Sequence, residues 1–118
     1  PLVLPGNGEA IIQFVFVQDV AWSVALLVEH KIAGAFNCAG NEVITLNGLV
    51  KTMASIVGKP VTIQYNPSAD QENFRENEFP FANENFFCEA VPLKKLGIAF
   101  TPLIDGLMAD YNNHYKFL

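Results

Sequence analysis

The first 40 residues contain two short apolar runs with an apolar segment of helical length between them, and few folds accommodate that order. Residues 11–17 form an apolar run between a turn and Asp19, which is typical of a buried strand. Asp19 is expected to cap a helix over residues 20–28, which is apolar on nearly every face and is therefore predicted to be buried on several sides. Residues 35–40 predict a second strand. A strand, a helix and a strand in this order favour a right-handed parallel crossover in a mixed α/β fold.

Local signals place the remaining elements. Thr45 is a favourable N-cap, apolar residues then recur at helical spacing, and Gly58 stands where a helix commonly ends in glycine. Residues 60–65 alternate as a strand does. Residues 92–96 predict a short helical turn, and residues 101–102, a threonine and a proline, predict the capped start of the last helix.

The least regular stretch, residues 66–90, holds six acidic residues and five phenylalanines against one base, Arg75. A loop of this length inside a compact domain is either functional or a sign that the element boundaries are wrong. Arg75 either pairs with a neighbouring glutamate or faces an anionic group of a substrate. Phe81 belongs to the phenylalanine cluster, for which core packing is favoured over stacking on nucleic-acid bases. Arg75 and Phe81 are thus candidate residues on the substrate side.

Two further polar residues are candidates for contact with a substrate. Asn7 lies in a turn formed by residues 5–8, and Gln13 lies on the first predicted strand. Each of them either reaches a ligand at the edge of a cleft or serves the turn or the strand edge. His30 and His114 stand alone near predicted helix ends, so we expect both on the surface.

Charge and cysteine content exclude several classes of protein. The formal net charge is −5, and a protein that binds nucleic acid by itself usually carries a basic surface, so we expect this segment to bind neither nucleic acid nor a membrane. No apolar run reaches the roughly 18 residues of a membrane-spanning helix. Cys38 and Cys88 predict two buried free thiols in a reducing setting, and no pair of cysteines or histidines has the spacing of a zinc site. Because the chain starts with Pro1, we expect a piece of a longer protein.

Four segments, taken in order, carry a family resemblance. Residues 13–21 are similar to an F-V-x-V-x-D-V-A segment, residues 34–40 to a G-x-x-[FY]-N-x-x-G strand, residues 45–58 to a T-x-x-x-L…G helix and residues 96–107 to an L-G-[WI]-x-P…G-L pattern. These patterns are those of the extended short-chain dehydrogenases, the NAD-dependent epimerase/dehydratase family. Within that family, the phenylalanines of residues 79–87 look like those of the chloroplast stem-loop-binding group, which is often described as mRNA-binding.

This resemblance implies a two-part α/β protein of Rossmann type. Residues 1–118 would be a single C-terminal, substrate-side segment of the extended short-chain dehydrogenase fold, with the cofactor-binding part absent. The longer parent would bind NAD or NADP as an epimerase/dehydratase-like oxidoreductase. The implied partners of the segment are its own N-terminal cofactor-binding domain and a small-molecule substrate, for which a sugar derivative is one candidate. The implied location is the cytoplasm, or the stroma of an organelle if the source is a plant.

The residues that carry the family's chemistry are not found in the segment. The G-x-G at residues 6–8 precedes a predicted strand, whereas a cofactor loop joins a strand to a helix. The resemblance also implies a catalytic tyrosine with a lysine four residues later, which lowers the pKa of the tyrosine, but Tyr65 and Tyr111 are followed at that spacing by alanine and tyrosine. Ile12 stands where nucleotide-sugar enzymes of the family often carry an arginine that faces phosphate, so nucleotide-sugar specificity is not implied.

We therefore expect no catalytic, cofactor-binding or metal-binding residue in this segment, which would be inactive alone. Whether the parent is an enzyme stays open, because the alternative is an RNA-associated, non-catalytic relative on the same fold. The predicted strands at residues 11–17 and 35–39 would lack sheet partners in the segment. Exposed strand edges pair between chains, so we also expect a homo-oligomer.

Overall fold

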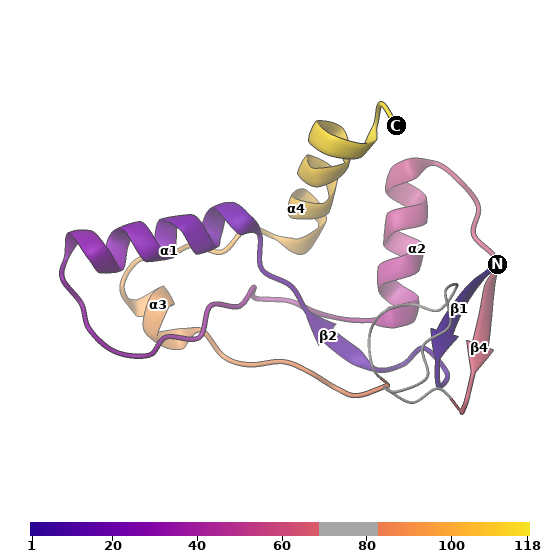
Figure 1. The fold of residues 1–118 in the computed structure, drawn as a ribbon, viewed down its shortest axis with the longest axis horizontal. Helices are drawn as coiled ribbons and strands as arrows, with labels where there is room; N and C mark the ends of the chain where they lie inside the picture. Colours follow the sequence, from indigo (N-terminus) through magenta and orange to yellow (C-terminus); the bar gives the residue numbers. More distant parts are fainter. Residues whose placement is uncertain (69–82) are drawn as a thin grey trace.

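Short strands and helices alternate along the computed structural model, which describes residues 1–68 and 83–118 (Figure 1). The fold is mixed α/β, as the sequence predicted. None of the helices in the described ranges combines the length and the apolar character that crossing a membrane requires. The elements in chain order are β1 (Leu2–Pro5), β2 (Ile11–Gln13), α1 (Val17–Glu29), β3 (Val43–Thr45), α2 (Leu46–Val57), β4 (Ile63–Asn66), α3 (Val91–Lys95), α4 (Leu103–Asp110) and the π-helix η1 (Tyr111–Tyr115).

The strands of the described residues form two separate two-stranded sheets. β1 pairs in parallel with β4, with Leu2 opposite Ile63, and β2 pairs in antiparallel fashion with β3. The parallel pair therefore joins β1 to β4, and the parallel crossover predicted between residues 11–17 and 35–40 is wrong. β4 begins and ends slightly later than the strand predicted at residues 60–65, and β1 was not predicted.

Residues 35–40 form no strand and run as irregular chain beside the end of β2. One backbone hydrogen bond joins the two segments, from Gly40 N to the carbonyl O of Phe14 at 3.0 Å. A Cβ atom at Gly40 would clash with that carbonyl oxygen, so the glycine is what permits the close approach. β2 is shorter than the strand predicted there, because α1 begins at Val17.

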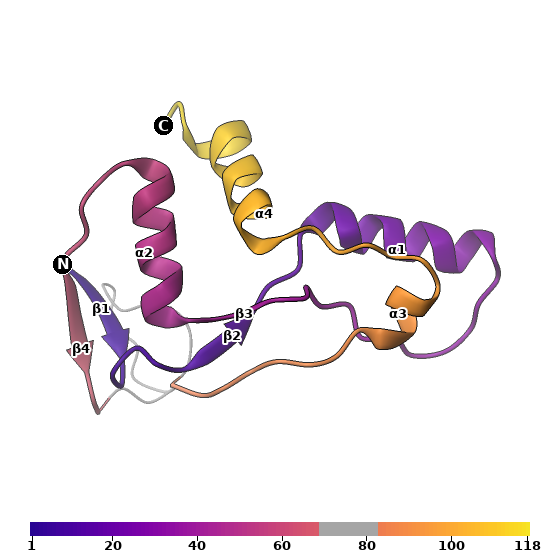
Figure 2. The same cartoon turned by 180° about the vertical axis from the view of Figure 1, so that it is seen from behind.

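Helix α1 is exposed over much of its surface, so the prediction that it is buried on several sides is wrong. Val17, Val24 and Val28 follow one another at helical spacing and are 74%, 55% and 70% exposed. The buried residues of the helix are Asp19 and Ser23. The segment that carries α3 lies along one side of α1 (Figures 1 and 2). An apolar face of α1, which we name the α1 face and define by the three valines, is left open to solvent.

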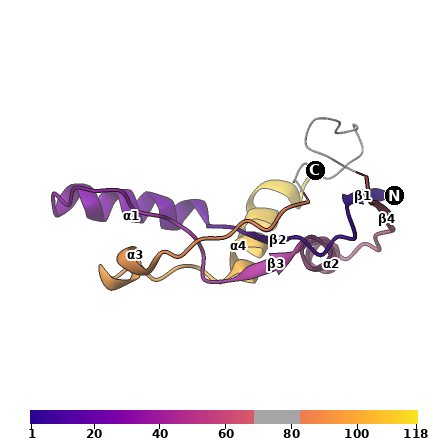
Figure 3. The ribbon, with the colours of Figure 1, turned by 90° about the horizontal axis from the view of Figure 1, so that it is seen from below.

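The buried side chains form two separate clusters. The first cluster lies where β1, β2 and α2 meet and consists of Leu4, Ala10, Ile12, Leu46, Leu49 and Val50. The second cluster lies beside α1 and around α3 and consists of Ala39, Ala90, Leu93, Ile98 and Phe100. The chain is consequently flat and elongated, with extents of 48 × 33 × 20 Å (Figure 3). Its radius of gyration is 16.5 Å, against about 13.5 Å for a compact domain of this length.

The ends of α2 and the position of α3 confirm the local predictions. Thr45 Oγ1 accepts a hydrogen bond from Gly48 N at 3.0 Å, which caps α2. Gly58 ends the helix in the left-handed conformation, with φ of 71°. The short helix α3 ends just before Gly97, which also has a positive φ, of 105°.

The predicted caps of α1 and α4 are wrong, and for a shared reason. Asp19 lies in the first turn of α1, whose N-cap is Phe16, and Asp19 is 1% exposed. Its carboxylate accepts hydrogen bonds from Thr101 N at 2.7 Å and from Thr101 Oγ1 at 2.9 Å. Thr101 therefore does not cap α4, which has Pro102 at the N-cap and no side-chain cap bond. The Asp19–Thr101 pair instead fastens α1 to the chain that enters α4.

Candidate functional site

The carboxyl ends of the parallel strands β1 and β4 lie together at one end of the molecule (Figure 1). Open α/β folds commonly bind ligands at such strand ends. After β1 the chain makes the predicted turn, in which Gly6 and Gly8 have φ values of 59° and 75°. Gly6 N donates to the carbonyl O of Asn66, the last residue of β4, at 2.8 Å. The turn thereby places Asn7 beside the end of the sheet.

Asn7 keeps one polar group available to a ligand. Its Oδ1 accepts a hydrogen bond from Glu9 N at 3.1 Å, and its carbonyl O accepts one from Asn47 Nδ2 at 3.0 Å. Its own Nδ2 has no partner among the described residues. An exposed amide of this kind can donate to a hydroxyl or carbonyl oxygen. The geometry is therefore compatible with both of the roles considered for Asn7, in the turn and toward a ligand.

Asn47, in the first turn of α2, connects the parts of this edge, and the sequence did not single it out. Besides its bond to Asn7, its Nδ2 donates to Glu9 Oε1 at 2.6 Å, and its Oδ1 accepts from the hydroxyl of Tyr65 at 2.9 Å. One side chain thus joins α2, the turn after β1 and strand β4. No periodic pattern marks such a residue, because its partners lie 40, 38 and 18 residues away along the chain.

Residues 83–88 bring further amides to the same edge. Asn85 Oδ1 accepts a hydrogen bond from Ile11 N at 2.9 Å, so this segment lies along β2. Asn83 packs against Gly6, where an added Cβ would come within 2.5 Å of the side-chain amide. The positive φ of Gly6 is what favours glycine at that position, since the exposed side chain of Asn83 could move aside. We define the amide edge by the four asparagines Asn7, Asn47, Asn83 and Asn85.

The described part of the amide edge is poorly suited to phosphate. The first three N–H groups of α2 already donate to Ala10 O, Gly8 O and Thr45 Oγ1, at 3.1, 2.9 and 3.0 Å, so this helix N-terminus offers them to no anion. Ile12, at the position of the family's arginine, is 6% exposed and belongs to the first cluster. Neutral amide groups suit a hydroxyl-bearing ligand.

Both polar ends of Gln13 are engaged within the protein. Its Nε2 donates to Gly40 O at 2.6 Å, and its Oε1 accepts from Cys88 N at 2.8 Å. Gln13 thereby holds β2, residues 35–40 and the chain before α3 together. Of the two roles considered from the sequence, this geometry favours the one at the strand edge.

Arg75 and Phe81 lie outside the described residues, so their contact with a substrate stays a prediction. Two phenylalanines of the same cluster are described. Phe86 and Phe87 are 74% and 61% exposed. Core packing, which the sequence favoured for the cluster, is therefore wrong for these two residues.

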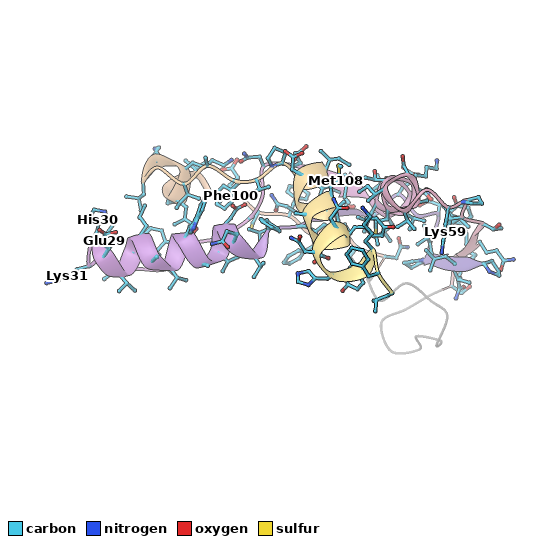
Figure 4. All side chains as sticks on the ribbon, turned by 90° about the horizontal axis from the view of Figure 1, so that it is seen from above. Glu29, His30, Lys31, Lys59, Phe100 and Met108 are labelled. Carbon is cyan, nitrogen blue, oxygen red and sulfur yellow. The ribbon has the colours of Figure 1, made fainter. Side chains whose placement is uncertain are left out.

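The remaining candidate groups are the two histidines and the two cysteines. His30 lies at the far end of α1 and is exposed, as is His114, which confirms both surface predictions (Figure 4). Cys38 and Cys88 are free thiols, and each is half-buried where burial was predicted. Among the described residues, no three histidine, cysteine or acidic side chains are grouped so that they could hold a metal ion.

Solved epimerases share this fold. The UDP-glucuronic acid 4-epimerase of Bacillus cereus, in complex with UDP-glucuronic acid and NAD, matches with a TM-score of 0.75 and 22% identity over 100% of this chain and 36% of that one. The UDP-glucose 4-epimerase of Thermotoga maritima, with UDP-glucose, matches with a TM-score of 0.72 and 21% identity over 98% and 35% of the two chains. The chain therefore has the Rossmann-type fold of the epimerases and short-chain dehydrogenases, over about a third of their length.

One curated relative agrees with the resemblance seen in the sequence. The chain is similar to the chloroplast stem-loop binding protein of 41 kDa b of Arabidopsis thaliana, with 29% identity over 119 residues. The match covers 95% of this chain and 31% of the relative, so the chain spans about a third of that protein's length. No protein-family model matches the chain. The resemblance to the epimerase/dehydratase family, and within it to the stem-loop-binding group, is confirmed.

Proposed function

We propose that this chain is the substrate-side part of an NAD(P)-dependent epimerase/dehydratase-like oxidoreductase and is inactive alone. The observation that carries the proposal is the fold, because the whole chain superposes on about a third of the Bacillus cereus epimerase with a TM-score of 0.75. Residues 1–118 then act as one segment, and the rest of the parent supplies the NAD(P) site. The chloroplast location of the curated relative supports a parent in the stroma of an organelle, and the cytoplasm stays the alternative.

The α1 face is the surface that we assign to the parent's cofactor-binding domain. Val17, Val24 and Val28 form an exposed apolar row on a helix that the rest of this chain covers on one side. Contiguous exposed apolar patches on a soluble domain mark interaction surfaces. Docking of the cofactor-binding domain there would bury the three valines.

Contact with the substrate is assigned to the amide edge. Asparagine side chains donate and accept hydrogen bonds without carrying charge, which suits the hydroxyl groups of a sugar-derived molecule. Asn47 holds the edge in place through its bonds to Asn7, Glu9 and Tyr65. The side-chain Nδ2 of Asn7 would make the direct contact.

Hydride and proton transfer are assigned to the rest of the parent. The hydroxyl of Tyr65 donates to Asn47 Oδ1, and no lysine follows Tyr65 at the four-residue spacing that a catalytic tyrosine of this family requires. Tyr111 also lacks such a lysine. The segment therefore binds and orients a substrate without reacting with it.

Titration of NADH into the 118-residue chain tests this division of roles. We expect no change in NADH fluorescence up to about 1 mM, because the glycine-rich strand–turn–helix that receives pyrophosphate is lacking. A longer chain of the same protein that includes the residues before Pro1 should bind NADH. Micromolar binding by the 118-residue chain, or no binding by the longer one, would contradict the proposal.

RNA binding is the second candidate function, and two observations favour it. The curated relative is a stem-loop binding protein, and Phe86 and Phe87 expose flat rings on which unpaired bases could stack. The net charge of −5 opposes tight binding by this segment alone. Replacing NADH by a labelled RNA stem-loop in the same titration separates the two functions. Binding that weakens between about 50 and 200 mM salt, and weakens again in Phe86→Ala, would support RNA binding.

A further inference from the structure

A surface hollow of about 790 Å³ lies between α2 and the helical end of the chain formed by α4 and η1. Its apolar lining includes Ile104, Met108 and Tyr111, and Ile104 and Met108 are 43% and 46% exposed. Lys51 and Lys116 line the hollow from its two sides, and no carboxylate is among the lining residues that the structure describes. A cationic apolar hollow is unusual on a chain whose net charge is −5.

The π-helix η1 helps to place Lys116 at this hollow. Lys116 N donates to the carbonyl O of Tyr111 at 2.8 Å, which is a bond across five residues. Such a turn is wider than an α-helical turn and changes which residues share a face. Ile104, Met108, Asn112 and Lys116, which are four residues apart, all line the hollow. Single π-turns often occur at functional positions.

The chemistry of the hollow requires a partner that is both apolar and acidic. Apolar side chains would cover Ile104 and Met108, and carboxylates would face the two lysines. Opposite charges around an apolar contact fix which partner binds and in which register. A segment of this same chain with these properties lies at residues 84–89.

Residues 84–89 present two exposed rings between two exposed carboxylates. Phe86 and Phe87 are 74% and 61% exposed, and Glu84 and Glu89 flank them. The backbone of the segment is held in place, because Phe86 N donates to Ile11 O at 2.8 Å and Cys88 N donates to Gln13 Oε1 at 2.8 Å. Little conformational entropy is lost when a segment that is already ordered binds.

The segment and the hollow lie in different parts of one molecule. In Figure 1 the chain that precedes α3 runs below β2, whereas α2 and α4 stand above it. We propose that Phe86 and Phe87 of one copy dock into the α2–α4 hollow of a second copy, with Glu84 and Glu89 facing Lys51 and Lys116. Because the two surfaces differ, the contact is head-to-tail and continues into a ring or an open chain of copies.

Charge reversal on each surface tests the proposal by sedimentation velocity. The double variant Lys51→Glu with Lys116→Glu reverses the charge of the hollow. The double variant Glu84→Lys with Glu89→Lys reverses the charge of the segment. We expect each double variant alone to associate at least about tenfold more weakly than the native chain, because like charges then face each other. Mixing the two variants should restore association, since each reversed surface then meets its complement.

Three outcomes would overturn the proposal. These are a native chain that stays monomeric at about 1 mM, a double variant that associates like the native chain, and a mixture that fails to regain association. Circular dichroism checks that each variant is folded. Because the four positions are exposed, we expect the native spectrum, and a misfolded variant would be recognised by its changed spectrum. If a charge-reversed variant does not fold, Phe86→Ser with Phe87→Ser makes the same test. A monomer is then expected, and unchanged association overturns the proposal.

Discussion

Asp19 is almost inaccessible to water, and in the part of the chain that the structure describes its carboxylate accepts hydrogen bonds from Thr101 N and Thr101 Oγ1. An unpaired buried carboxylate is strongly unfavourable, so these two hydrogen bonds, together with the second cluster, hold α1 against the chain before α4. The sequence placed Asp19 correctly near the start of a helix. Its partner lies 82 residues away, and no local pattern in one sequence reports such a distance.

Replacing Asp19 should destabilise the chain in a graded manner. We expect Asp19→Ala to lower the free energy of unfolding by about 2 kcal/mol, because the partly buried Thr101 N loses its acceptor. Asp19→Asn should lose about 1 kcal/mol, since its amide oxygen still accepts from Thr101 N and the threonine hydroxyl can accept from the amide N–H. Urea denaturation measures both values.

The matched control is Asp105→Ala. Asp105 is also an acidic residue in the first turn of a helix, α4, but its side chain is exposed. Asp105→Ala should lower the free energy of unfolding only slightly, as is usual when a charge near a helix N-terminus is removed. Equal losses for Asp19→Ala and Asp105→Ala would show that the bonds to Thr101 contribute little.

The candidate residues of the amide edge show the same limit of prediction. Asn7 was recognisable as a polar residue in a turn, and Gln13 as a polar residue on a predicted strand. What each side chain contacts depended on residues far along the chain, since the partners of Gln13 lie 27 and 75 residues away. Asn47 was missed for the same reason. It lies in the first turn of α2 and does not interrupt the apolar pattern of that helix.

Among the elements, those with signals inside their own sequence were predicted well. α2 has its N-cap at Thr45 and a glycine at Gly58, and both features depend on residues within a few positions. Residues 35–40 resemble a strand in composition, yet a strand also requires a neighbour to pair with. Among the described residues, β3 is the strand that pairs with β2, and residues 35–40 meet this part of the chain through the bond from Gly40 N to Phe14 O, beyond the end of β2.

The cap of α2 offers a prediction at this scale. Thr45→Ala removes the acceptor of Gly48 N and should lower the free energy of unfolding by about 1 kcal/mol. Thr45→Ser keeps the hydroxyl and should stay within about 0.5 kcal/mol of the native chain. Thermal unfolding followed by far-ultraviolet circular dichroism measures the difference. A serine variant as unstable as the alanine variant would mean that the strand β3, rather than the cap, is what Thr45 supports.

The shape of the whole molecule was not predictable from its sequence. Apolar content indicated a chain able to form a core, but the structure divides that core into two clusters and leaves the α1 face exposed. The order of motifs nevertheless predicted the mixed α/β fold and the family resemblance. Sequence motifs show the order of the elements along the chain. How far apart the elements lie in space depends on their packing, which a motif does not report.

The two clusters have no residue in common, and this separation bears on how the molecule opens. A domain with one continuous core unfolds as a unit, whereas regions with separate cores can open sub-globally, each with its own free energy. Leu93→Ala, a change at a side chain that is 1% exposed in the second cluster, should therefore speed amide hydrogen exchange in α1 and α3 and leave α2 protected. Leu49→Ala, in the first cluster, should do the reverse. Equal acceleration throughout the chain would instead reveal a single cooperative unit, in which the Asp19–Thr101 pair and Gln13 couple the two halves.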